Sequence, residues 1–136
     1  MTITTFDPAG ELIIVNVLVS NAQGKIADVR FALNTGSSAT LVLPEVTDDL
    51  GYSARDGDAI TVIRSPIGNE RGYMMRVASF SALGFTIPDF RIHVHDLPEG
   101  YGIEGVLGLS FLKQFNYEVR SREGRILVER IAPAAV

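Results

Sequence analysis

The sequence predicts an all-β fold, a sandwich or a barrel, built from 136 residues. Three observations predict it. The apolar residues fall in short runs rich in β-branched side chains, turn residues separate these runs at regular spacing, and the best helix candidate is only about two turns long. About two thirds of the unfolded surface of a chain this size can be buried, so a core needs no disulfide. We therefore expect one domain over residues 1–136.

The first half of the chain predicts a hairpin, a polar loop and a short strand. The expected elements are strands over 12–19 and 25–33 joined by a turn at 21–24, a strand over 40–43, and a helical turn over 44–51. In the second strand, apolar residues alternate with polar or small ones, which is typical of a half-buried strand. The loop Asn-Thr-Gly-Ser, at 34–37, interrupts two apolar runs, which makes it the first candidate for a functional site.

The second half predicts one long hairpin, a glycine cluster, a short helix and a closing hairpin. The expected elements are strands over 59–64 and 73–80 around a turn-rich tip at 65–72, a strand over 85–95, a helix over 109–115, and a hairpin closed at 121–124. Glycines at 100, 102, 105 and 108 separate the strand over 85–95 from the helix.

Composition excludes several kinds of site. A net charge of −4 and a pI near 5.1 argue against a nucleic-acid partner, which favours a basic surface. The absence of cysteine excludes disulfides, thiolate catalysis and cysteine-ligated zinc. The N-terminus lacks the basic and apolar regions of a signal peptide, and no apolar run is long enough to span a bilayer. We expect a cytoplasmic protein, or a soluble domain of a longer one.

Two motifs carry less weight than they first suggest. Gly100, Gly102 and Gly105 match the dinucleotide pattern G-x-G-x-x-G, but the helix that follows is too short for a βαβ crossover. His93 and His95 share one strand face and could begin a metal site, yet two imidazoles fall short of a closed ligand set. We expect these histidines on a solvated face, and we expect no metal and no cofactor.

The segments FALNTGSSATLV at 31–42 and IEGVLGLSFLKQF at 103–115, read together, carry a family resemblance. The first reads apolar-apolar-x-Thr-Gly-Ser, and the second is an apolar-apolar-Gly run that leads into the helix. This pair, with the hairpin over 59–80 between them, resembles the retropepsin-like aspartic proteases across residues ~11 to ~130. The resemblance implies the closed acid-protease barrel with one short helix, and an aspartic endopeptidase that works as a homodimer.

The resemblance also implies the roles of individual residues. Two copies of the x-Thr-Gly loop would meet on a dimer axis, where paired carboxylates activate a water on a peptide bond. Thr35 would bond across that axis, Gly36 would allow close backbone approach, and Ser37 would orient the neighbouring carboxylate. An extended peptide substrate would lie under the flap, the hairpin over 59–80. We expect the flap tip (Ile67, Gly68, Asn69) and Val106 to contact it.

The sequence departs from the family at one position, since Asn34 stands where the family has its catalytic aspartate. An amide has nearly the shape of a carboxylate but no titratable proton near neutral pH, so it cannot act as general acid or base. We therefore expect an inactive form. We favour an engineered replacement of a working aspartate, because every supporting residue matches the active pattern. The alternatives are a natural pseudoprotease that binds peptides or mediates dimerisation, and a structural β-domain without a cleft.

Overall fold

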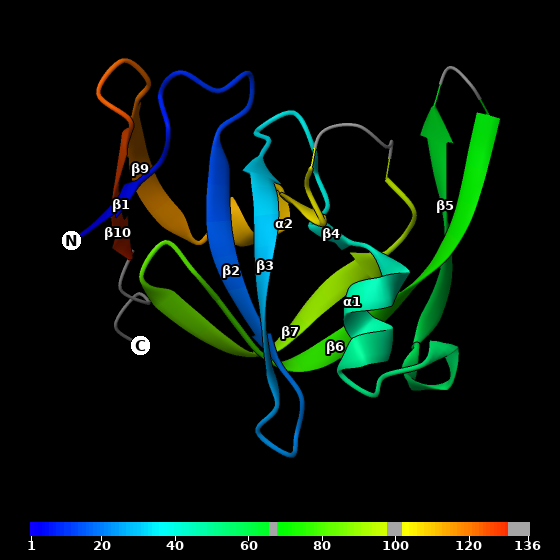
Figure 1. The fold of residues 1–136 in the computed structure, drawn as a ribbon. Helices are drawn as coiled ribbons and strands as arrows, with labels where there is room; N and C mark the ends of the chain where they lie inside the picture. The colour runs from blue at the N-terminus through cyan, green and yellow to red at the C-terminus, as the bar shows by residue number, and fades with distance from the viewer. Residues whose placement is uncertain (66–67, 98–101, 131–136) are drawn as a thin grey trace, which may run out of the picture.

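The computed structural model describes residues 1–65, 68–97 and 102–130, with the side chains of 61–71 excluded. It confirms the all-β fold class (Figure 1). The strands are β1 (Thr2–Thr5), β2 (Ile14–Ser20), β3 (Ile26–Leu33), β4 (Leu41–Val42), β5 (Ala59–Ser65), β6 (Gly68–Ala82), β7 (Phe85–Val94), β8 (Gly105–Leu107), β9 (Phe115–Arg120) and β10 (Arg125–Arg130). The helices are α1 (Pro44–Asp49), a 3-10 turn over Ala54–Asp56, and α2 (Leu109–Leu112).

Six strands close into a barrel in the order β2-β3-β8-β4-β7-β6, because β6 pairs with β2 as well as with β7. Closure removes the exposed edges that an open sheet would present. Strand β5 pairs with β6 and extends the sheet outward as a long hairpin (Figure 1). Two pairs in the barrel are parallel, β3 with β8 and β4 with β7. The β3–β8 pair and the antiparallel β4–β8 pair bring the two segments of interest together.

The core fills the barrel and follows directly from strand alternation. On β2, Val15, Val17 and Val19 are buried while the residues between them face outward. Phe80 lies at the centre, with the rings of Phe31, Phe90 and Phe111 at centroid distances of 5.7, 4.7 and 5.4 Å. The other large side chains that are fully buried include Leu50, Met75, Ile92, Leu107, Leu112 and Ile126.

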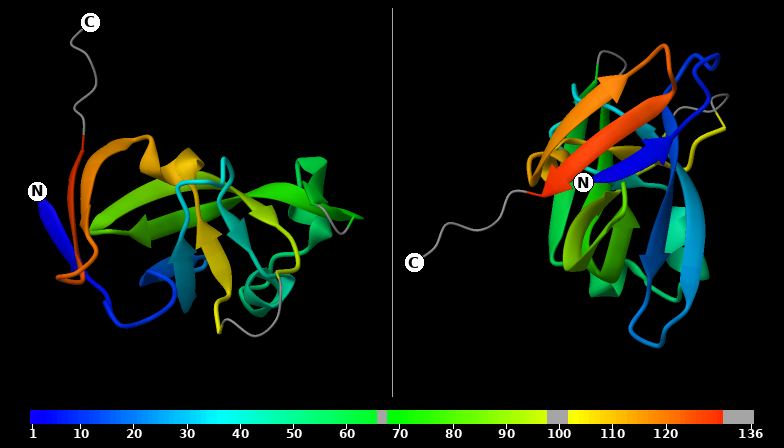
Figure 2. Two further views of the ribbon diagram at one scale, coloured as in Figure 1. Left: turned by 90° about the horizontal axis from the view of Figure 1, so that it is seen from above. Right: turned by 90° about the vertical axis from the view of Figure 1, so that its left-hand side faces the viewer.

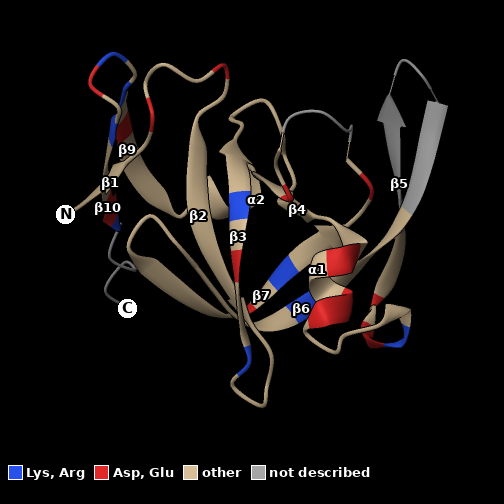
Figure 3. Ribbon diagram, viewed as in Figure 1, with Lys and Arg blue, Asp and Glu red and all other residues tan. Residues whose placement is uncertain are grey.

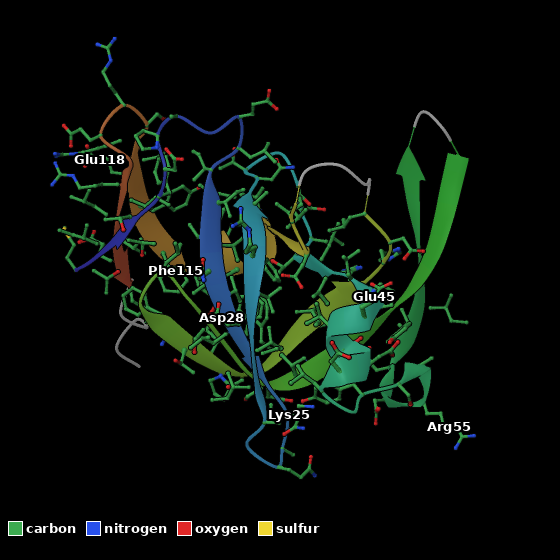
Figure 4. The ribbon with its side chains drawn as sticks, viewed as in Figure 1. Lys25, Asp28, Glu45, Arg55, Phe115 and Glu118 are labelled. Carbon is green, nitrogen blue, oxygen red and sulfur yellow. The ribbon has the colours of Figure 1, made fainter. Side chains whose placement is uncertain are left out.

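A second, three-stranded sheet joins the two ends of the described chain. Its order is β1-β10-β9, and the views of Figure 2 show it beside the barrel. Phe115 of β9 is buried against the aromatic cluster, and Glu118, three residues later, faces solvent (Figure 4). The sequence did not predict β1, because Thr2–Thr5 has little apolar content of its own and depends on β10 for its pairing. The helix expected over 109–115 is confined to Leu109–Leu112, because β9 begins at Phe115.

The expectation that His93 and His95 face solvent is wrong. His95 is only 1% exposed, and His93 is half-buried beside Ile92 and Val94, which are also buried. Pairing with β4 and β6 occupies the two edges of β7 and not its faces, so the burial of His95 comes from side-chain packing, and its ring lies directly against Gly72 of β6. A Cβ on Gly72 of β6 would lie 2.6 Å from Nδ1 of His95, so this glycine leaves room for the ring.

Among the described residues, none of the helices has both the length and the apolar character needed to cross a membrane.

Candidate functional site

The Asn-Thr-Gly-Ser loop leaves the barrel at the end of β3 and returns as β4, and β8 runs between these two strands. Ala32 of β3 pairs in parallel with Val106 of β8, and Leu41 of β4 pairs with the same Val106 in antiparallel fashion. The two segments singled out from the sequence therefore lie side by side, as Figures 1 and 2 both show in cyan and yellow. The loop therefore crosses over β8, the strand that precedes α2.

Backbone hydrogen bonds hold the loop on this strand. The Asn34 N–H donates to the Leu107 carbonyl at 2.9 Å, and the Leu109 and Ser110 N–H groups donate to the carbonyls of Ser37 and Ser38 at 2.8 and 3.0 Å. Since these bonds join both ends of the loop to one short segment, they restrict the position of residue 34.

Close packing at Gly108 shows why the second segment needs a glycine. A Cβ at this position would lie 2.1 Å from the carbonyl oxygen of Ala39 and 2.7 Å from that of Ser37. Both are backbone atoms, so they cannot rotate away as a side chain could. Gly105 meets a similar limit in the core, because a Cβ there would lie 2.4 Å from the ring of Phe31.

The side chain of Asn34 is exposed at the tip of the barrel, together with Thr35 and Gly36. Its Oδ1 accepts a hydrogen bond from the Gly36 N–H at 2.9 Å, which closes a short turn at the start of the loop. The Ser37 hydroxyl donates to the Ala39 carbonyl at 2.8 Å, within its own loop rather than to residue 34. The loop has no charged residue from Asn34 to Thr40 (Figure 3).

The predicted substrate contacts lie only partly within the described chain. Ile67 lies outside the described residues. Gly68 and Asn69 belong to the start of β6, where they pair with Ser65 and Arg64 of β5, and their side chains are not described. Val106 is half-buried in β8, directly between the strands that bear the loop. Strands β5 and β6 form the hairpin predicted over 59–80, while its role as a flap and its contact with a ligand stay predictions.

Sequence reasoning missed Thr40, which is fully buried where the loop enters β4. Its Oγ1 accepts hydrogen bonds from the Gly108 N–H at 3.2 Å and from the Ser110 hydroxyl at 2.8 Å. A threonine at the start of an apolar strand is common, so the only available signal was the serine that follows the glycine run in the second segment.

The described residues contain no group of three or more histidine and acidic side chains placed to hold a metal ion. At His93, burial lowers the pKa of the ring, and the nearby charges of His95 and Arg91 lower it further. This histidine therefore favours its neutral form in the folded chain.

Comparisons with known proteins agree with this geometry. A family model described as aspartyl protease matches residues 15–111, which include the first segment, the hairpin, and the second segment as far as Phe111. The fold is similar to that of a retropepsin-like aspartic protease from Rickettsia conorii, with a TM-score of 0.66 and 18% identity over 93% of this chain and 96% of that one.

Two further solved structures share the fold. EIAV protease in complex with the inhibitor HBY-793 has a TM-score of 0.58 and 21% identity, over 77% of this chain and 88% of that one. The retroviral protease-like domain of Ddi1 from Leishmania major has a TM-score of 0.59 and 13% identity, over 88% of this chain and 90% of that one. No curated protein matches the chain.

Proposed function

The chain belongs to the aspartyl protease family, and from that premise we propose that it is a retropepsin-like endopeptidase assembled as a homodimer and silenced by the amide at position 34. The observation that carries the proposal is the loop Asn34–Ser37, held at the barrel tip across the glycine-containing strand β8. This arrangement presents residue 34 outward on a fixed backbone, as a site shared between two copies requires.

The proposed chemistry needs two acidic groups, and one chain supplies one loop. When two carboxylates face each other closely, their like charges cannot both persist, so one stays protonated while the other accepts a proton from water. The water attacks the peptide carbonyl, and the protonated acid then donates to the leaving nitrogen. Two Asn34 amides provide neither a base nor an acid, and this is why we expect no turnover from the chain as it stands.

The exposure of Asn34, Thr35 and Gly36 supports a partner copy at this tip. Three consecutive exposed residues that follow the buried Phe31 and Ala32 and the half-buried Leu33 are consistent with a surface that another copy covers. We propose that an extended peptide lies between this tip and the β5–β6 hairpin, pairing with the hairpin backbone as an added strand. Such pairing would give affinity through the main chain and leave specificity to pockets near Val106.

The test is Asn34→Asp, assayed against a peptide library between about pH 4 and pH 7, where a shared-proton pair is active. We expect cleavage by this variant, and none by the Asn34 chain or by a matched Asn34→Ala control. A folded, dimeric Asn34→Asp chain that cleaves nothing would contradict the protease proposal and favour the peptide-binding or dimerisation module. A chain that stays monomeric at micromolar concentration in sedimentation would instead favour the structural β-domain.

A further inference from the structure

We propose that Thr40 is a positioning residue, which sets the place of the Asn34 loop by binding it to the start of α2. The proposal deepens the proposed function, since the loop in question carries the proposed site. Thr40 does not reach the tip itself, and its effect on residue 34 passes through the five residues between them.

The geometry of Thr40 is that of a buried bridge. The side chain is 0% exposed, and its Oγ1 accepts two hydrogen bonds whose donors lie 68 and 70 positions later in the sequence. One donor is the Gly108 backbone N–H, and the other is the Ser110 hydroxyl. A buried donor without an acceptor is costly, so the Gly108 N–H depends on this oxygen, whereas Ser110 is a surface residue whose hydroxyl adds the second bond.

Thr40 differs in kind from the other contacts of the loop. The bonds from Leu109 and Ser110 to the loop carbonyls run from backbone to backbone, so a side-chain substitution does not delete them. Among the described residues, the side-chain hydrogen bonds that join 34–40 to 107–110 all end on the Thr40 hydroxyl. The Thr40 hydroxyl is therefore the group through which a side-chain substitution can change the position of the loop.

The main chain of Thr40 also joins the loop to the hairpin side of the barrel. Its carbonyl accepts a hydrogen bond from the His93 N–H at 2.9 Å, and β7, which contains His93, pairs with β6. Thr40 thus bonds to α2 through its side chain and to β7 through its backbone. Loss of the side-chain contact leaves the loop with its backbone bonds alone, and this looser attachment to α2 would displace residue 34 relative to a partner copy.

The first test needs no activity and uses the Asn34 chain. Thr40→Val keeps the side-chain shape and removes the acceptor, Thr40→Ser keeps the acceptor, and Thr47→Val is the matched control. Thr47 is equally buried, at 0% exposure, but its hydroxyl donates to Pro44 within α1, away from the loop. We expect the hydrogens of the Leu109 and Ser110 amides to exchange with solvent at least about tenfold faster in Thr40→Val than in the parent chain. In Thr40→Ser and Thr47→Val, we expect their exchange rates to stay within about twofold of the parent.

The proposal is overturned if Thr40→Val leaves these amides as protected as in the parent, or if Thr47→Val exposes them equally. Should Thr40→Val not fold, Ser110→Ala takes its place, because it removes one donor from a surface residue. Ser110→Ala alone must then raise the exchange rate of the Leu109 amide hydrogen. An unchanged rate at Leu109 would overturn the proposed bridge.

The second test separates positioning from the proposed chemistry. In an Asn34→Asp background, we expect Thr40→Val to lower kcat by about tenfold at an unchanged KM, and Thr40→Ser to restore it. Full kcat in the Thr40→Val double variant would overturn the positioning role. If Asn34→Asp alone gives no turnover, the proposed function fails, and the exchange experiment still decides the role of Thr40.

Discussion

Replacing Gly108 by alanine should strongly destabilise the fold, because the added Cβ has no space. It would lie 2.1 Å from the Ala39 carbonyl oxygen, whereas ordinary contact begins near 3.4 Å, so the loop must retreat by more than about 1 Å. Such a shift strains the bond from Leu109 to Ser37. Overpacking costs about 1–3 kcal/mol and a weakened hydrogen bond about 1 kcal/mol. We expect a loss of about 3 kcal/mol in the free energy of unfolding.

Urea denaturation followed by circular dichroism measures this loss, with Gly24→Ala as the matched control. Gly24 has a φ of +88°, and a Cβ added there would have nothing within 4 Å, so its substitution reports backbone strain alone. That strain is about 1–2 kcal/mol. If Gly108→Ala lost less stability than Gly24→Ala, the close approach of loop and glycine run would be refuted.

Two further predictions concern the closure of the barrel and its response to pH. Tyr52→Phe should lower the free energy of unfolding by about 1 kcal/mol, as measured by urea denaturation. The reason is that the Tyr52 hydroxyl donates to the Ser20 carbonyl and accepts from the Ala78 N–H, both at 3.0 Å. Unchanged stability would argue against this bridge. Burial, followed by the charge of His95, lowers the pKa of His93 in the folded chain, so the unfolded chain binds that proton more readily. Stability should therefore fall as the pH drops below about 6.5, the ordinary histidine value. His93→Gln should reduce this dependence, and an identical pH profile in that variant would contradict the assignment.

The sequence predicted the strands of the barrel well because their apolar residues alternate with polar ones. The run from Ile26 to Leu33 shows a half-buried pattern, and the turn before it is polar. The order of loop, long hairpin, glycine run and helix predicted the closed barrel through its family resemblance. What local patterns could not predict was β1, whose residues pair with β10 from the far end of the chain.

The sequence indicated the residues of the candidate site, but not the buried residues packed around it. Asn34 and the glycine run stand out because polar residues and glycine interrupt apolar strands. Thr40 and His95 do not stand out, since their burial depends on neighbours that are distant in sequence. His95 was misjudged because strand alternation assigns one face to solvent, whereas its ring packs against Gly72 of β6, a contact that the local pattern of β7 does not reveal.

The central claim, that two copies of residue 34 make one active site, can be tested by mixing. Asn34→Asp and Asn34 chains would be combined in equal amounts, allowed to exchange subunits, and assayed at constant total concentration. If both copies must supply an acid, only pairs of two aspartates cleave, and activity falls to about one quarter of that of pure Asn34→Asp. Activity that falls only to about one half, in proportion to the aspartate chains present, would show that each chain acts alone and would contradict the claim.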